Sequence, residues 1–464
     1  MIIPVSERLK EIRENSTPVG THSLWYQGEL RSFNVYEVDL SLLKYNHLNG
    51  RILSLSTEYA VEHGIELADL DTSKRQSIIA NWIWNKNKSK NELTYEDLKL
   101  KGQIQPGVVT SDGLIVDGNR RFMLLSRLQN SGESKKFKTV ILNDTYTSGG
   151  ATDIDLDIKR LETSIQMGMD EKLDYDAIEK YLKIKDLMSL PRKKMPVKEI
   201  ATMMNYKKGK SSEPDADRVL YLYDVCKMMD RYLKFFGMPD MYSTIQKQED
   251  LFQKLVTMVN LYKSGKKTAL RWTPSDDEIE EYIIVCFYTI RYIYNKEKAY
   301  DSTDPKTVRD LLFKNSKKGV FADKTMWNDY KTNVKYDTLH EVIKKSDQNK
   351  AIKEYTNNGI KLSEAYTAVN KDWAKLAGND RFKKGINIAI SNVNNKYGNI
   401  RPSELILEVY GKMMQFIDED EYKAHGAISM NDKVDKLDSK DLTLSQNIDL
   451  VRKVSEKIKK ALKN

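Results

Sequence analysis

The stretch GLIVDGNRRFMLLSRL, from Gly113 to Leu128, decides how the N-terminal part of this chain folds. It opens with a short apolar run, breaks at Gly118 and then places two adjacent arginines, Arg120 and Arg121, at the head of an apolar-rich segment. A short apolar run that ends at a turn residue is typical of a strand, and the segment after the break is typical of a helix. The stretch therefore predicts a strand that turns into a helix, with both arginines in the first helical turn.

Two arginines at the start of a helix favour an anionic ligand. The first turn of a helix leaves backbone N–H groups without partners inside the helix, and the helix dipole adds partial positive charge there. Gly118 lets a ligand approach the backbone closely, and the guanidinium groups of Arg120 and Arg121 can each bind two oxygens. These features predict a phosphate site. The alternative is a strand followed by an ordinary helix whose arginines only face solvent.

The segments around this stretch predict a mixed unit of strands and helices. Alternating apolar and polar residues over 33–40 indicate a half-buried strand. The helical run 74–101 ends at Gly102, which is expected to be a C-cap glycine. Two short strands are expected on either side of the turn 111–113, and another strand over 138–144.

Strand patterns nearly vanish after about residue 156, and helical spacing continues to the end of the chain. The expected fold class is an α+β N-terminal domain followed by mainly α-helical domains. We predict three domains: an α+β domain at 1–155, a helical domain at 156–298 and a helical domain of unknown role at 299–464.

Composition limits the classes of function. The 464 residues carry 76 Lys and Arg against 67 Asp and Glu, a net charge of +9, which modestly favours a polyanionic partner. No run approaches the roughly 20 apolar residues that span a membrane, and the N-terminus lacks the pattern of a signal sequence. The two cysteines, Cys226 and Cys286, are too few for a disulfide framework or a four-cysteine zinc site. We expect a cytoplasmic protein with no membrane partner.

Three segments in order resemble one known family. The run 98–128 contains the glycine that ends a helix, a Gln-Pro pair and the box Gly-Asn-Arg-Arg, and it resembles the N-terminal domain of ParB-type partition proteins, a fold shared with sulfiredoxin. Upstream, YNHLNGRI at 45–52 is similar to the first nucleotide-contacting loop of that family, and downstream RLETSIQMGMDEKLDY at 160–175 is similar to its third box. The resemblance covers roughly residues 33–230. Sulfiredoxin chemistry is excluded because no cysteine precedes Cys226.

The resemblance implies CTP as the ligand, with Mg²⁺ between the phosphates and the protein. Glu162 is the expected metal ligand and the candidate catalytic residue if CTP is slowly hydrolysed. The implied nucleotide-binding residues are Asn46, Arg51, Gln105, Asp117, Gly118, Asn119, Arg120, Arg121, Glu162 and Thr163. The chain departs from the family at Asn119, where the family usually has Glu, and at Thr163, where it usually has Asn. These departures leave nucleotide choice and hydrolysis open.

The run 195–229 has the pattern of a helix-turn-helix, and the ParB-type family has a DNA-reading motif at the same place. Its apolar residues Ile200, Ala201 and Met204 are expected on one buried face. The turn is long, and the second helix starts with acidic residues, which phosphates repel. The alternative is an ordinary helical hairpin with a solvated lysine loop. The predicted DNA contacts are Lys193, Lys194, Lys198, Lys207, Lys208, Lys210 and Arg218.

The last segment, 447–464, has an apolar helical face that favours a homodimer or docking on its own domain.

Together, these patterns and the family resemblance predict a ParB-like DNA-binding protein with a nucleotide switch. It is expected to act in plasmid or chromosome partition or a related process in a bacterium, plasmid or phage. One alternative is an enzyme on the same fold, such as a nucleotide hydrolase, kinase or nuclease. Another is a nucleotide-sensing regulatory or defence protein.

Overall fold

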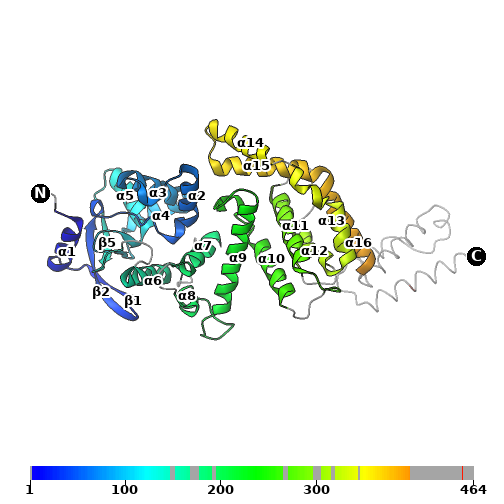
Figure 1. Cartoon of the computed structure of the whole chain (residues 1–464). Coiled ribbons are helices and arrows are strands. Elements are labelled where there is room, and N and C mark those ends of the chain that lie inside the picture. Colours follow the sequence, from blue (N-terminus) through cyan, green and yellow to red (C-terminus); the bar gives the residue numbers. More distant parts are fainter. Residues whose placement is uncertain are drawn as a thin grey trace, which may run out of the picture. The chain divides into compact units, whose positions relative to one another are not determined.

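The computed structural model in Figure 1 describes residues 3–146, 152–167, 177–190, 195–264, 270–295, 305–314, 319–342, 345–397 and 452. Internal contacts divide the chain into two compact units. The first contains the described parts of 1–266, 275–302 and 337–379. The second contains the described parts of 267–274, 303–336 and 380–464.

A five-stranded sheet in the order β1-β2-β5-β3-β4 forms the centre of the N-terminal region. Its strands are β1 (Gly20–Tyr26), β2 (Glu29–Asp39), β3 (Gly107–Val109), β4 (Ile115–Asp117) and β5 (Lys136–Ile141). Neighbouring strands are antiparallel except β3 and β5, which are parallel. The strands predicted over 33–40, around 111–113 and over 138–144 are confirmed.

The edge strand β1 was not predicted. It joins β2 through Gln27 and Gly28, whose φ angles of 54° and 83° match the tight hairpin turns that keep the right-handed twist of two strands. Only Leu24 and Tyr26 of this strand are buried, so its apolar alternation is short. The hairpin turn, rather than a strong strand pattern, sets its position.

Helices cover both faces of the sheet. One face packs on α1 (Val5–Asn15), α3 (Thr72–Lys86), α4 (Lys88–Lys101) and α5 (Asn119–Asn130), with Val38 and Phe137 in the shared core. The other face packs on α6 (Asp153–Met167) through Ile158 and Leu161. The predicted domain boundary between residues 155 and 156 therefore lies inside a helix that belongs to the sheet core.

The helix predicted over 74–101 is two helices. Asn87, with φ −150° and ψ 62°, separates α3 from α4 because these angles lie outside the helical region. The prediction for Gly102 is confirmed, since its φ is 70° and its N–H donates to the carbonyl of Leu98. The short helix α2 (Leu53–His63) precedes α3.

Three further helices follow α6: α7 (Ala177–Met188), α8 (Val197–Met203) and α9 (Ala216–Phe235). They share a core that is separate from those on the two faces of the sheet and that includes Leu156 of α6. Ile200, Ala201 and Met204 are buried in it, as the sequence predicts. This core holds α7 against α8 and α9.

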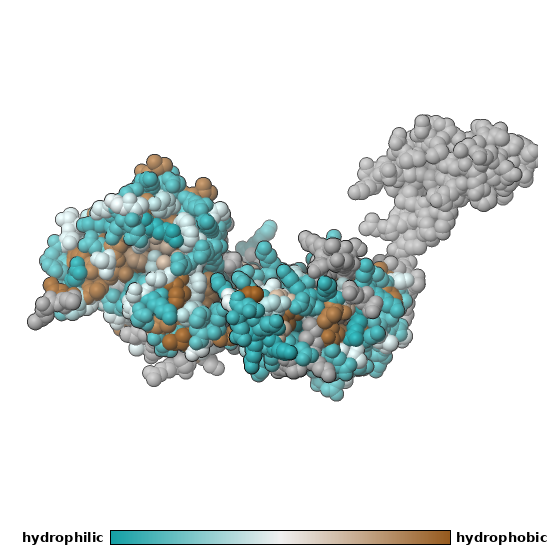
Figure 2. Space-filling view, turned by 90° about the horizontal axis from the view of Figure 1, so that it is seen from above, coloured by the Kyte–Doolittle hydropathy of each residue, from teal (hydrophilic) through white to brown (hydrophobic). Residues whose placement is uncertain are grey.

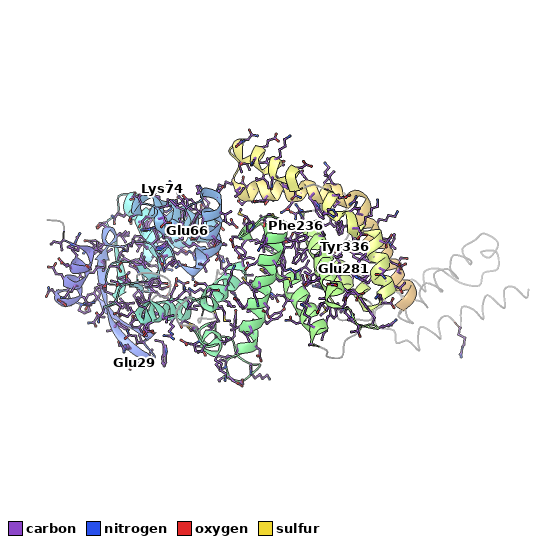
Figure 3. All side chains as sticks on the ribbon, viewed as in Figure 1. Glu29, Glu66, Lys74, Phe236, Glu281 and Tyr336 are labelled. Atoms are coloured by element: carbon purple, nitrogen blue, oxygen red, sulfur yellow. The ribbon has the colours of Figure 1, made fainter. Side chains whose placement is uncertain are left out.

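The remaining helices fall in both units. In the first, α11 (Asp276–Asn295) packs on α10 (Glu249–Lys263) and α15 (Leu362–Ala377), which also contacts α14 (Lys345–Asn357). Here the Arg291 guanidinium is buried over the rings of Phe236, labelled in Figure 3, and Trp373. In the second unit, α13 (Lys324–Asn333) packs on α16 (Lys383–Tyr397), which also contacts α12 (Pro305–Leu312).

Short 3-10 helices connect several of these elements: η1 (Leu40–Leu42), η2 (Gly50–Ile52), η3 (Leu67–Asp69), η4 (Tyr242–Ile245), η5 (Val320–Ala322) and η6 (Tyr336–Glu341). Within the described ranges, none of the helices combines the length and apolarity needed to cross a bilayer. On the face shown in Figure 2, hydrophilic side chains predominate and apolar ones form separate groups. The predicted self-association segment 447–464 lies outside the described residues, apart from Arg452.

Candidate functional site

The turn between β4 and α5 requires glycine. Gly118 is the N-cap of α5 and has a φ of 103°, a conformation that side-chain-bearing residues rarely adopt. A Cβ atom there would lie 2.9 Å from Cζ of Phe137 and 3.2 Å from Nη2 of Arg121. Gly118 thus lets the backbone before α5 lie close to Phe137 of β5 and leaves room for the Arg121 side chain. The predicted strand-to-helix turn is confirmed.

The two arginines of the box diverge. Nη2 of Arg121 lies 2.8 Å from Oδ2 of Asp117, and its Nη1 donates to the carbonyl of Gln105 at 3.1 Å. Adjacent residues on a helix point about 100° apart, so Arg120 leaves this group. Its Nε donates to Oδ1 of Asn91 at 2.6 Å, and its Nη2 contacts the carbonyl of Lys90 and the hydroxyl of Thr94 on α4.

Arg120 therefore joins α5 to α4, whereas Arg121 remains beside the Gly118 turn. The prediction that both arginines bind one phosphate group is not supported for Arg120. Nothing in the dipeptide itself shows that the two side chains have different partners. The Gln105 side chain is exposed, and only its backbone contacts Arg121.

Three predicted residues from separate segments meet in one buried network. The backbone N–H of Asn46 donates to Oδ1 of Asn119 at 3.1 Å, and Nδ2 of Asn46 donates to Oε1 of Glu162 at 3.5 Å. Asn119 also donates to the carbonyl of Ile115 at 3.2 Å. All three side chains are buried. The loop before η2, the start of α5 and the middle of α6 are thus joined by polar contacts.

Glu162 has a cationic partner that the sequence did not suggest. Nζ of Lys183, on α7, lies 3.0 Å from Oε2 of Glu162, and the two side chains are 0% and 1% exposed. Nε2 of Gln166 also donates to Oε1 at 3.4 Å. The hydroxyl of the neighbouring Thr163 donates to the carbonyl of Lys159 at 2.8 Å within α6.

Lys183 belongs to a row of charges on one face of α7. Glu179, Lys183 and Asp186 are four and three residues apart, which places them on one side of a helix. Asp186 pairs with Lys159 at 2.8 Å. The spacing of these three charges by four and three residues is the sequence signal that could have identified the row, although Lys180 and Lys185 on the same helix obscure it.

Glu179 connects this row to the Arg51 loop. Its carboxylate accepts hydrogen bonds from the hydroxyl of Ser54 at 2.7 Å and from Nζ of Lys86 at 2.9 Å. The same Lys86 ammonium donates to the carbonyl of Arg51 at 2.7 Å. The turn at Arg51 is further held by Asn49, whose side chain accepts from the Arg51 N–H at 2.8 Å.

The loop around Asn46 lies in cationic surroundings. The pKa of His47 is lowered from its usual value by burial and by the nearby charges of Arg75 and Lys44. A neutral imidazole is therefore favoured near neutral pH. Burial is the larger cause, and the charges of Arg75 and Lys44 add a positive contribution that suits an anionic ligand.

A divalent metal at Glu162 fits these residues poorly. Both of its carboxylate oxygens already accept hydrogen bonds, one of them from an ammonium group. Among the residues that the structure describes, no group of three or more His, Cys, Asp and Glu side chains is arranged to hold a metal ion.

The predicted DNA-binding helices are joined by a small hairpin instead of a compact turn. Residues 204–215 lie between α8 and α9, with Lys207 paired to Pro214 in an isolated antiparallel bridge. A typical helix-turn-helix has a turn of about three or four residues. The acidic start of α9 has a structural role, because Asp215 caps the helix by accepting from the N–H of Arg218 at 3.0 Å.

The basic side chains of this region are exposed. The Arg218 guanidinium lies 4.5 Å from the ring centre of Tyr206, and Nζ of Lys208 is 3.5 Å from Oε1 of Glu213 at the surface. Lys193 and Lys194 lie outside the described residues. The exposed members of the predicted set are Lys198, Lys207, Lys208, Lys210 and Arg218.

Comparison of the chain with protein-family models, curated proteins and solved structures gave no match.

Proposed function

We propose that this chain is a nucleotide-controlled DNA-binding protein in which a nucleoside triphosphate binds at the Gly118 turn. The observation that carries this proposal is the meeting of Asn46, Asn119 and Glu162 beside that turn. Residues that are far apart in the sequence share one buried polar network, and a satisfied network of this kind holds its members in a single rigid arrangement. CTP is the nucleotide that the family resemblance implies.

The triphosphate is proposed to lie at the start of α5. Backbone N–H groups and the helix dipole favour an anion there, and Gly118 leaves the backbone accessible. Arg121 supplies a guanidinium group beside this turn, and Arg51, from the loop that follows Asn46, is the second proposed contact. The nearby charges of Arg75 and Lys44, which together with burial lower the pKa of His47, add positive potential to this loop. Arg120 is left out of the proposed contact set because its guanidinium points to α4, whereas that of Arg121 lies beside the Gly118 turn.

The proposed DNA contacts are the exposed basic residues of α8, the hairpin and the start of α9. Lys198, Lys207, Lys208 and Lys210 suit phosphate oxygens, which attract lysine independently of base sequence. Asp215 and Asp217 at the start of α9 disfavour base reading by that end of the helix. Sequence-independent binding to the DNA backbone is thus the mode that these residues support best.

Calorimetric titration of CTP, ATP and GTP tests the nucleotide site. We expect selective binding of one nucleotide, weakened at least tenfold by Arg121→Ala. Arg120→Ala is the matched control, because it removes an adjacent arginine whose contacts are with α4, and it should retain binding. Failure of all three nucleotides to bind would contradict the proposal. Release of inorganic phosphate by the bound nucleotide would favour the enzyme alternative.

A further inference from the structure

The expected metal ligand, Glu162, is already neutralised inside the protein. Its Oε2 is 3.0 Å from Nζ of Lys183, and its Oε1 accepts from the amides of Asn46 and Gln166 at 3.5 and 3.4 Å. Both Glu162 and Lys183 are fully buried. Mg²⁺ binds carboxylate oxygens at about 2.0–2.1 Å in a nearly octahedral arrangement and usually retains several water molecules. A fully buried carboxylate that is satisfied by three donors offers neither free oxygens nor room for those waters.

The charge balance also opposes a metal. A divalent cation on Glu162 would lie next to the Lys183 ammonium, and like charges in a buried place repel strongly. Expelling the ammonium instead would leave a buried lysine without a counter-charge, which is costly. Lys183 has no alternative partner on its own helix face, since Glu179 is paired with Lys86 and Asp186 with Lys159.

The second carboxylate of the predicted site is engaged too. Asp117 pairs with Arg121 at 2.8 Å. Glu162 and Asp117 thus each face a protein cation, and Asn119, two residues after Asp117, is linked to Glu162 through Asn46. A ligand at the Gly118 turn therefore lies near two carboxylates whose charges are already balanced by protein cations.

We infer that Lys183 takes the place of a divalent cation at this site, so that a nucleotide polyphosphate binds here without Mg²⁺. The nucleotide part of this inference rests on the proposed function. The metal part concerns Glu162 alone and does not depend on any nucleotide. Lys183 is thus assigned as a positioning residue that holds Glu162 in place and removes its affinity for metal ions.

Two measurements on the full chain test the inference. The first compares titrations of CTP in excess Mg²⁺ and in EDTA, and the two dissociation constants should agree within about threefold. The second follows Mn²⁺ by electron paramagnetic resonance without nucleotide, comparing wild type with Glu162→Gln. The two proteins should bind the same amount of Mn²⁺. Lys183→Met should gain a Mn²⁺ site because it removes the ammonium that occupies Oε2 of Glu162, and Lys180→Met, at an exposed position of the same helix, should not.

Either of two results overturns the inference. One is a tenfold or greater increase of CTP affinity with Mg²⁺. The other is a Mn²⁺ ion bound by wild type and lost in Glu162→Gln. If no nucleotide binds, the proposed function fails, and the Mn²⁺ comparison still decides whether Lys183 replaces a metal. If Lys183→Met does not fold, the amount of Mn²⁺ bound by wild type and by Glu162→Gln still shows whether Glu162 binds a metal ion.

Discussion

Lys183 and Glu162 form a salt bridge of 3.0 Å, with side chains that are 0% and 1% exposed. The pair joins α7 to α6, and Asn46 extends it to the loop before η2. Buried ion pairs seldom stabilise a protein more than well-packed apolar residues do, but removing one partner leaves a charge that water cannot reach. The network therefore fixes the geometry of the candidate site more than it raises stability.

The stability of this pair is the first prediction. Lys183→Met and Glu162→Gln should each lower the free energy of unfolding by about 3–5 kcal/mol, since each leaves a buried group without its partner. The double variant should lose clearly less than the sum of the two. Urea unfolding measures all three, and Lys180→Met should stay within about 0.5 kcal/mol of wild type as the surface control. Additive losses would mean that the two side chains do not interact.

Gly118 can be tested against a glycine of similar backbone conformation. Gly132 has a φ of 97°, but a Cβ atom there meets nothing within 4 Å, whereas at Gly118 it lies 2.9 Å from Phe137. Gly132→Ala should cost about 1–2 kcal/mol from its backbone conformation alone. Gly118→Ala should cost a further 1–3 kcal/mol or so from the steric conflict. Thermal and urea unfolding of both variants give the difference, and equal costs would show that the contact with Phe137 relaxes freely.

Arg120 should contribute to the stability of the fold. Its hydrogen bonds to Asn91, Lys90 and Thr94 hold α5 on α4, so Arg120→Ala should lower the free energy of unfolding by about 1–3 kcal/mol. Asn91→Ala should share part of this loss, because the two side chains are bonded to one another. A double-mutant cycle in urea measures the coupling. A coupling energy of zero would show that the hydrogen bond between Arg120 and Asn91 does not contribute to stability.

Glu58 gives a pH dependence with a defined sign. Burial is the main cause that raises the pKa of this α2 carboxyl above its usual 4.5, and Glu179 and Glu62 add to the rise, while hydrogen bonds from Ser243 oppose it. Between 4.5 and the raised value, the folded state binds more protons than the unfolded state, so stability falls as the pH rises through that window.

Glu58→Gln should remove this pH-dependent loss of stability, because glutamine does not ionise. As the pH rises from about 4 to 7, the free energy of unfolding of Glu58→Gln should therefore increase relative to that of wild type. Glu62→Gln, at an exposed position one turn further along the same helix, is the control and should show a smaller shift. Urea unfolding at several pH values measures it. A constant difference for Glu58→Gln would contradict the raised pKa.

The proposed DNA contacts in the hairpin between α8 and α9 give a prediction about salt dependence. Changing Lys207, Lys208 and Lys210 to Ala should weaken binding to duplexes of unrelated sequence to a similar degree, because phosphates carry no base identity. The slope of log K against log salt should fall in magnitude by about 2.7, since each phosphate contact contributes about 0.9. Fluorescence anisotropy at several salt concentrations measures this. Exposed lysines on α14 and α15, Lys353, Lys371 and Lys375, provide a charge-matched control that should leave the slope unchanged.

Features that depend on neighbouring residues could be read from the sequence. The turn at Gly118, the C-cap at Gly102 and the strand over 33–40 follow from backbone conformation and side-chain period, which are local properties. The break at Asn87 and the edge strand β1 were missed. Asn87 carries no strong helix-ending signal, and β1 owes its place to pairing with β2, which periodicity does not report.

The strand that turns into a basic helix start at Gly118 follows from the residues alone, and so does the choice of Asn46, Asn119 and Glu162 as candidate site residues. The partners of the charged residues follow from the packing of the helices: Arg120 with α4, Arg121 with Asp117, and Glu162 with Lys183. The physical reason is that a charge chooses its partner by distance and burial in the folded chain. These depend on how α4, α6 and α7 pack, and the residue types alone do not specify that packing.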